Sequence, residues 1–165
     1  MTNKQVYGMI EMVGEFYRAM GDGEYIGTGK YKNIERKTMR ENIFHEELTE
    51  FIEASYYKRE NLRRKRQLDA ICDMLYVAAG NLLENSKSIE QAKQKWTKGG
   101  IWETTTAEKM RKRTDFDVYT VYEAFKEVHR SNMTKICKDG TVLRREDGKI
   151  IKPETFEEPD LEKFL

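Results

Sequence analysis

The feature that most constrains the fold is a pair of long stretches, 34–58 and 62–84, in which apolar residues recur at the spacing of an α-helix. Both stretches carry acidic residues inside the apolar face. At about 100° per residue, Glu47 falls among apolar side chains of the first stretch, and Asp73 is the only charged residue within 70–80. A carboxylate that faces a core is costly unless something pairs with it. The sequence therefore predicts two amphipathic helices whose acids need a partner.

The short break between these helices indicates an antiparallel hairpin, which brings their acidic clusters face to face. Carboxylates that converge from two helices are suited to a hard, oxygen-seeking cation such as Mg²⁺, for which Mn²⁺ can substitute. The sharpest candidates for metal ligands are Glu47, Glu50 and Asp73. Glu46 and Asp69 follow closely, on the same two helices.

A structural interpretation of the same acids competes with the chemical one. Acidic residues at helical spacing often form a solvated face with Lys or Arg partners, and Glu46 fits that description as well as it fits a metal site. Asp73 could instead form a buried ion pair with an arginine of 63–66, although its neighbours are apolar. A chain of that kind would be a non-catalytic helical dimer or adaptor.

The rest of the chain is also predicted to be largely helical. Apolar periodicity predicts helices over 3–20 and 117–136, with a shorter helix that begins after Ser88 and ends at Gly99-Gly100. Within the polar stretch that follows, Thr105-Thr106-Ala107-Glu108 fits a capping box, so one or two helical turns are expected after it.

The last third of the chain carries one β signal. Asp147-Gly148 lies between two short β-prone runs, 141–145 and 149–152, which predicts a small β-hairpin. The expected fold is therefore an all-α helical bundle with a C-terminal β-hairpin, in a single domain of 1–165. Residues 86–116 are expected to be an insertion in that domain.

Composition limits the partners. Charged residues make up 36% of the chain and apolar ones 38%, a polar balance that favours completing the core against a second copy. The net charge of +1 argues against nonspecific nucleic-acid binding, and the basic run 58–66 is better explained as a solvated junction between helices. No stretch fits a membrane span or a secretory signal, and the two cysteines suggest no disulfide framework. A cytoplasmic setting is therefore expected.

The acidic clusters resemble the signature of the all-α NTP pyrophosphohydrolases, a family that includes MazG-like enzymes, dimeric dUTPases and phosphoribosyl-ATP pyrophosphohydrolases. Glu46-Glu47-Leu48-Thr49-Glu50 matches the first half of the signature, Glu-Glu-x-x-Glu, and Asp73 matches the final Asp of Glu-x-x-Asp. The Glu of that second half is replaced by Ala70, with Asp69 one residue earlier on the face of Asp73. An Asp-x-x-x-Asp form is similar to the phosphoribosyl-ATP subgroup.

The C-terminal part resembles the same subgroup, from 128–135 through the expected hairpin to Pro159-Asp160-Leu161. That resemblance implies substrate or phosphate contacts in this part of the chain. The residues it suggests are Asn132 and Lys135 first, then His129 and Arg130, with Lys149 and Lys152 as charges for the leaving pyrophosphate. Tyr76 is a further candidate, to stack on a base, although packing explains it equally well.

The resemblance implies hydrolysis of a nucleoside triphosphate, in particular a dNTP, to the monophosphate and pyrophosphate. Mg²⁺ or Mn²⁺ would be held by Glu47, Glu50, Asp69 and Asp73, and Glu46 would hold the attacking water or act as general base. Glu46 and Glu47 are thus the expected catalytic residues. A homodimer is expected from the family, and a tetramer is the larger alternative. A narrower specificity remains open: phosphoribosyl-ATP, dUTP, or the purines dATP and dGTP.

Overall fold

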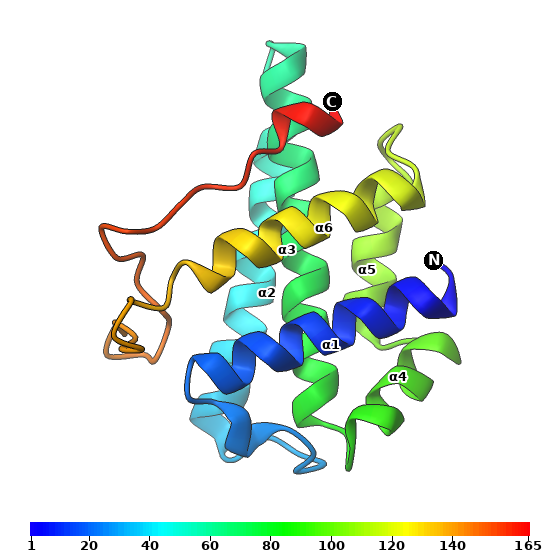
Figure 1. The fold of residues 1–165 in the computed structure, drawn as a ribbon. Helices are drawn as coiled ribbons and strands as arrows, with labels where there is room; N and C mark the ends of the chain where they lie inside the picture. Colours follow the sequence, from blue (N-terminus) through cyan, green and yellow to red (C-terminus); the bar gives the residue numbers. More distant parts are fainter.

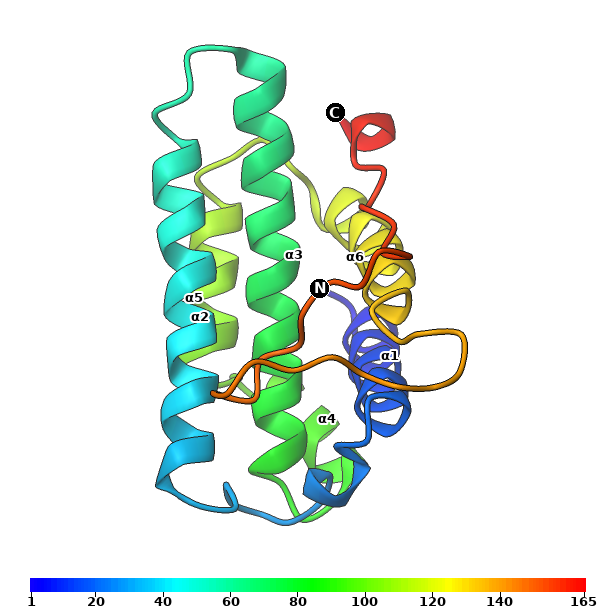
Figure 2. The ribbon, with the colours of Figure 1, turned by 90° about the vertical axis from the view of Figure 1, so that its left-hand side faces the viewer.

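The computed structural model describes residues 1–165 as six α-helices arranged in two layers (Figures 1 and 2). The helices are α1 (Asn3–Ala19), α2 (Ile34–Ala54), α3 (Glu60–Glu84), α4 (Ile89–Thr97), α5 (Trp102–Arg111) and α6 (Val118–Met133). Two single 3₁₀ turns, η1 (Gly23–Tyr25) and η2 (Glu162–Phe164), lie in the connecting segments. The predicted all-α class is confirmed.

One layer holds α2, α3 and α5, which stand side by side. The other holds α1 and α6, which lie next to each other and cross α3, while α4 packs against α1 and the lower end of α3 (Figures 1 and 2). Helix α3 is thus enclosed on several sides. From Leu68 to Glu84 every residue is buried except Asp69 and Asp73, which are half-buried. The two acids therefore mark the one open face of the central helix.

The helix starts follow from capping residues in the sequence. The side chains of Thr2, Asn33, Ser88 and Asp117 each accept a hydrogen bond from the backbone N–H three residues later. The predicted cap at Asn33 and the predicted start after Ser88 are confirmed. Gly99 and Gly100 end α4 with φ of 143° and 73°, conformations that a side chain would oppose.

Several predicted boundaries were wrong. Helix α2 ends at Ala54, short of residue 58, because the backbone N–H groups of Tyr56 and Tyr57 bond to carbonyls only three residues back, and the chain tightens into a turn. Helix α6 likewise ends at Met133, short of residue 136. Helix α5 begins at Trp102, so Thr105 lies inside it, and its first turn is closed by Thr104, whose hydroxyl accepts from the Ile101 N–H.

The predicted C-terminal β-hairpin was wrong. The chain does turn at Asp147-Gly148, and Arg144 and Ile150 form one isolated antiparallel bridge, but no strand is present. A pair of strands without further neighbours is marginally stable in water. Here the Arg144 guanidinium donates to the backbone carbonyl of Met20, the residue that follows α1, and this contact holds the segment against the helix. We call this segment, residues 137–152, the C-terminal loop.

The segment 86–116 builds α4 and α5, which pack on α1, α2 and α3 as part of the same core. After the C-terminal loop the chain returns along α6, where Leu161 is buried. No helix combines the length and the apolar character that crossing a membrane requires.

Candidate active site

The antiparallel pairing of α2 and α3 brings the predicted acids to one cavity. Glu47 and Glu50 of α2 and Asp69 and Asp73 of α3 all line it. None of these four makes an ion pair or a side-chain hydrogen bond within the protein. Their neighbours do: Glu46 pairs with Lys149, outside this group. The four carboxylates therefore line the cavity without a partner from the protein.

Burial and mutual repulsion change the protonation of these acids. Burial, followed by the charges of Asp73 and Glu50, raises the pKa of Glu47 from 4.5 to about 9. Burial and then the charge of Asp69 raise the pKa of Asp73 from 3.8 to about 7. The pKa of Asp69 is raised by burial and by Glu50. The cavity thus strongly favours an added positive charge.

The donor chemistry fits a hard divalent cation, because all four groups are carboxylates and such an ion relieves their repulsion. In the structure, however, no three His, Cys, Asp or Glu side chains are grouped closely enough to hold a metal ion. The predicted ligands therefore share a cavity without forming a coordination sphere.

Three lysines of the C-terminal part face the same cavity: Lys135, Lys149 and Lys152. Lys149 pairs with Glu46, and Lys152 donates to Glu158 over 2.9 Å. Lys135 makes no ion pair, and burial lowers the pKa of its ammonium. Acids from the hairpin and lysines from the C-terminal segment thus line one space.

A second cleft continues from this cavity between α1, α2, α3 and the C-terminal loop. Glu47, Asp73, Lys135 and Lys149 line both spaces. The walls of the cleft are largely apolar, from Phe16, Met20, Met39, Ile43, Val77 and Ile150. Its far end is polar. The whole space is therefore elongated, with acids at one end and arginines at the other.

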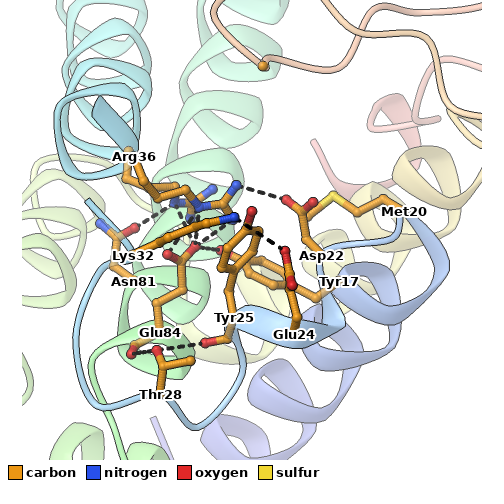
Figure 3. Close-up of polar contacts among 12 residues, drawn as sticks. Tyr17, Met20, Asp22, Glu24, Tyr25, Thr28, Lys32, Arg36, Asn81 and Glu84 are labelled. Atoms are coloured by element: carbon orange, nitrogen blue, oxygen red, sulfur yellow. Dashed lines mark hydrogen bonds and ion pairs between the residues drawn. The ribbon is translucent and has the colours of Figure 1, made fainter. Parts of the chain in front are cut away.

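Glu84 organises the polar end (Figure 3). Its side chain is fully buried and accepts hydrogen bonds from Arg36 of α2, at 2.8 Å from Nη2, and from the Tyr17 hydroxyl of α1, also at 2.8 Å. Arg36 also donates to Asp22 at 3.0 Å, and Asp22 accepts from Arg144 of the C-terminal loop at 2.9 Å. This network ties α1, α2, α3 and the loop together.

The remaining predicted residues lie at different depths. Tyr76 and Asn132 line the second cleft. His129 lies behind Tyr76, with its Nδ1 2.9 Å from the Tyr76 hydroxyl and its Nε2 3.4 Å from Glu15. Burial lowers the pKa of His129, so it is neutral at pH 7 and holds Tyr76 in place.

Two predicted residues lie apart from the cavity. Arg130 is exposed and donates to Glu127 and Glu157. Glu46 is exposed and lines a neighbouring groove, and it reaches the edge of the cavity through its ion pair with Lys149. The structure therefore brings together the metal and phosphate candidates, but it does not bring Arg130 to them.

Sequence reasoning missed the arginine end. Arg36 and Arg40 lie eleven and seven residues before Glu47, which places all three on one stripe of α2. Gly80 lies seven residues after Asp73, on the same stripe of α3, and gives the matching signal on that helix. These shared stripes are only a weak signal, because an arginine or a glycine on a helix is ordinary.

Comparisons with known proteins single out the same part of the chain. A family model described as phosphoribosyl-ATP pyrophosphohydrolase matches residues 13–95, half of the chain. The match contains all four unpaired carboxylates and Arg36, Arg40 and Glu84, and it ends before α5, α6 and the C-terminal loop. No curated protein and no solved structure matches the chain.

Proposed function

Since the chain belongs to the phosphoribosyl-ATP pyrophosphohydrolase family, which makes it a nucleotide pyrophosphohydrolase, we propose a specific reaction for it. The protein cleaves a nucleoside triphosphate, in particular a dNTP, with the help of a divalent metal ion. The products are the monophosphate and pyrophosphate. The observation that carries the proposal is the cavity in which four unpaired carboxylates face three lysines. Acids alone would repel a triphosphate, and lysines alone would not activate water.

Glu47, Glu50, Asp69 and Asp73 are the groups that would hold the cation, with Mg²⁺ as the physiological ion and Mn²⁺ as a substitute. When bound, such an ion supplies a Lewis acid for the phosphate and for the attacking water. The lysines Lys135, Lys149 and Lys152 bind the phosphates as point charges and offset the charge of the leaving pyrophosphate.

Glu46 has two proposed roles. The first is to hold the attacking water or to accept its proton. The second follows from its ion pair with Lys149, which fixes the position of that lysine at the edge of the cavity. Glu46→Gln would impair both, whereas Lys149→Met would impair only phosphate binding.

The test is a panel of the common NTPs and dNTPs, together with phosphoribosyl-ATP, each with Mg²⁺ or Mn²⁺ and each scored for monophosphate and pyrophosphate. Glu47→Gln is compared with Glu41→Gln, an exposed glutamate on the same helix whose partner is Lys37 at 3.7 Å. We expect metal-dependent pyrophosphate release that Glu47→Gln abolishes and Glu41→Gln retains.

A protein that releases pyrophosphate from no nucleotide and binds no Mn²⁺ in calorimetry would contradict the proposal and favour a non-catalytic helical adaptor. Phosphoribosyl-ATP is included because the matching family carries its name. Turnover of that compound alone would replace the dNTP with a phosphoribosyl nucleotide and leave the reaction type unchanged.

A further inference from the structure

One arginine at the polar end of the cleft has a donor that the protein does not use. Arg40 is only 8% exposed. Its Nε donates to the Asn81 side chain and its Nη2 to the Val77 carbonyl, both at 2.8 Å. Its Nη1 makes no hydrogen bond, yet it is not sealed off by other atoms, and Arg40 lines the cleft. Because solvent reaches Nη1 and no protein group uses it, this donor is available to a ligand.

The rest of the guanidinium is held in place. Gly80 of α3 lets it lie against the helix backbone, because a Cβ at that position would fall 2.6 Å from the Tyr17 hydroxyl and closer still to Arg40. The Tyr17 ring adds a cation–π contact, with its centroid 5.7 Å from the Arg40 Cζ. The free Nη1 is therefore a fixed donor and not one group of a mobile side chain.

The position of Arg40 fits the far edge of a nucleobase. Arg40 precedes Glu47 by two helical turns, about 10 Å along α2, which is comparable to the length of a nucleoside. Ile43 and Val77 line the cleft between them and are suited to a base and sugar. With the triphosphate at the carboxylates and lysines, the base reaches the arginine end.

The arginines supply donors at that end. Asp22 is the carboxylate that lines it, and its two oxygens are each engaged by a guanidinium, from Arg36 and from Arg144. Arginine carries no acceptor. A base whose exocyclic group is an oxygen is therefore matched better there than one whose exocyclic group is an amine, because the amine would face donors.

We propose that Arg40 donates through Nη1 to an exocyclic oxygen of the base, so that nucleotides of guanine, hypoxanthine, uracil and thymine are preferred to those of adenine. Adenine is the common base without such an oxygen, and its exocyclic group is an amine. This inference rests on the proposed pyrophosphohydrolase function and adds the class of base to it.

The first experiment compares dITP with dATP, and ITP with ATP, in wild-type protein with Mg²⁺. The members of each pair keep the same purine frame and exchange the oxygen at position 6 for an amine. We expect kcat/KM to favour the oxygen-bearing member by roughly ten- to hundredfold.

Two variants then test the assignment to Arg40. In Arg40→Gln, the guanidinium, which only donates hydrogen bonds, is replaced by an amide that both donates and accepts. The ratio of kcat/KM for dITP to kcat/KM for dATP should therefore fall toward one. Lys37→Gln is the matched control: this exposed lysine of α2 lies outside the cleft and pairs with Glu41 at 3.7 Å, so the ratio should stay high. If Arg40→Gln fails to fold, Arg40→Lys is used instead. Lysine keeps the positive charge, but its single ammonium cannot bond to both protein acceptors and also present a fixed donor to the base. The dITP/dATP ratio of kcat/KM should therefore fall in this variant as well.

The outcomes are separable. If no nucleotide yields pyrophosphate, the proposed function fails. If pyrophosphate is released but dATP is turned over as well as dITP, the inference about the base fails and the function stands. A high ratio that persists in every folded Arg40 variant would equally contradict the role of Arg40.

Discussion

At the scale of single residues, two glutamates of the helical hairpin differ in whether the fold supplies partners for the carboxylate. Glu84 is fully buried and is satisfied by Arg36 and Tyr17. Glu47 is half-buried and has no partner, so the fold tolerates its charge without stabilising it. Repulsion that lowers stability is expected where a group is retained for function and not for folding.

Glu47→Gln should therefore stabilise the metal-free protein while abolishing turnover. The pKa of Glu47 is raised from 4.5 to about 9, so the stability that its protonated form contributes is full below pH 4.5 and is lost as the pH rises toward 9. Urea unfolding of the variant should show a gain of about 1 kcal/mol at pH 9 and little difference at pH 4. A loss of stability at pH 9 would indicate that Glu47 has a structural partner.

Gly80→Ala and Gly14→Ala should have opposite effects on thermal stability. A methyl group at Gly80 would collide with Arg40 and Tyr17, so we expect a loss of about 1–3 kcal/mol. A methyl group at Gly14 of α1 meets nothing closer than the Arg18 side chain at 3.5 Å, so improved helix propensity should add up to about 1 kcal/mol. Calorimetric Tm values that move in the same direction for both would show that packing at Gly80 is looser than described.

The sequence singles out the acids because they break a local rule: charges inside an apolar stripe are visible without knowing what lies opposite. Arg40 breaks no such rule, since an arginine on a helix is ordinary. Its importance arises from Asn81 and Val77, which lie about forty residues away in sequence and reach it only through the packing of α2 on α3. That kind of information requires the three-dimensional structure.

At the scale of elements, helices were predictable and the C-terminal loop was not. Helix existence depends on apolar period and on caps such as Asn33 and Asp117, which are local. The C-terminal loop takes its shape from distant contacts, with Arg144 at the end of α1 and Lys149 on α2. An Asp-Gly turn between β-prone runs is therefore present without the strands that it usually joins.

Glu127 attaches the end of the chain to α6, and its removal should matter only above acid pH. The hydrogen bonds from Arg130, from the Asp160 backbone N–H and from Lys163 lower the pKa of Glu127 from 4.5 to about 2. A lowered pKa in the folded state gives stability that is present above pH 4.5 and is lost as the pH falls toward 2.

Glu127→Gln should accordingly cost roughly 1–3 kcal/mol at pH 7, with the difference from wild type shrinking between pH 4.5 and 2. Glu123→Gln, on the same helix with only Lys126 as partner at 2.6 Å, is the control and should change stability by less than about 0.5 kcal/mol. Urea midpoints across this pH range provide the measurement. Equal losses in the two variants would remove Glu127 from its anchoring role.

At the scale of the whole molecule, the outer side of α2 is the best candidate surface for the predicted homodimer. Ile34 and Ile52 are 66% and 46% exposed and lie at the same angle around the helix, with His45 between them. The exposed Trp102 of α5 packs beside His45, with ring centroids 5.6 Å apart. These exposed apolar side chains are the groups that a second copy of the chain could cover.

Ile52→Glu should therefore reduce the mass measured by light scattering to that of a single chain, without lowering the helix content. Ile151→Glu is the control, because Ile151 is similarly exposed, at 41%, but lies in the C-terminal loop away from α2's outer side. A wild-type protein that is already monomeric at micromolar concentration, or an Ile52→Glu variant with unchanged mass, would rule out this surface.

The two-ended cleft also determines where the chain can change length during evolution. Both ends are built on the same two helices, so one residue inserted between Arg40 and Glu47 would rotate one set of side chains by about 100° relative to the other. Insertions in the 55–59 turn or in the 86–88 connection would leave that register untouched. Related sequences should thus vary in length at the turns and hold the Arg40-to-Glu47 spacing constant, whatever substrates they have come to accept.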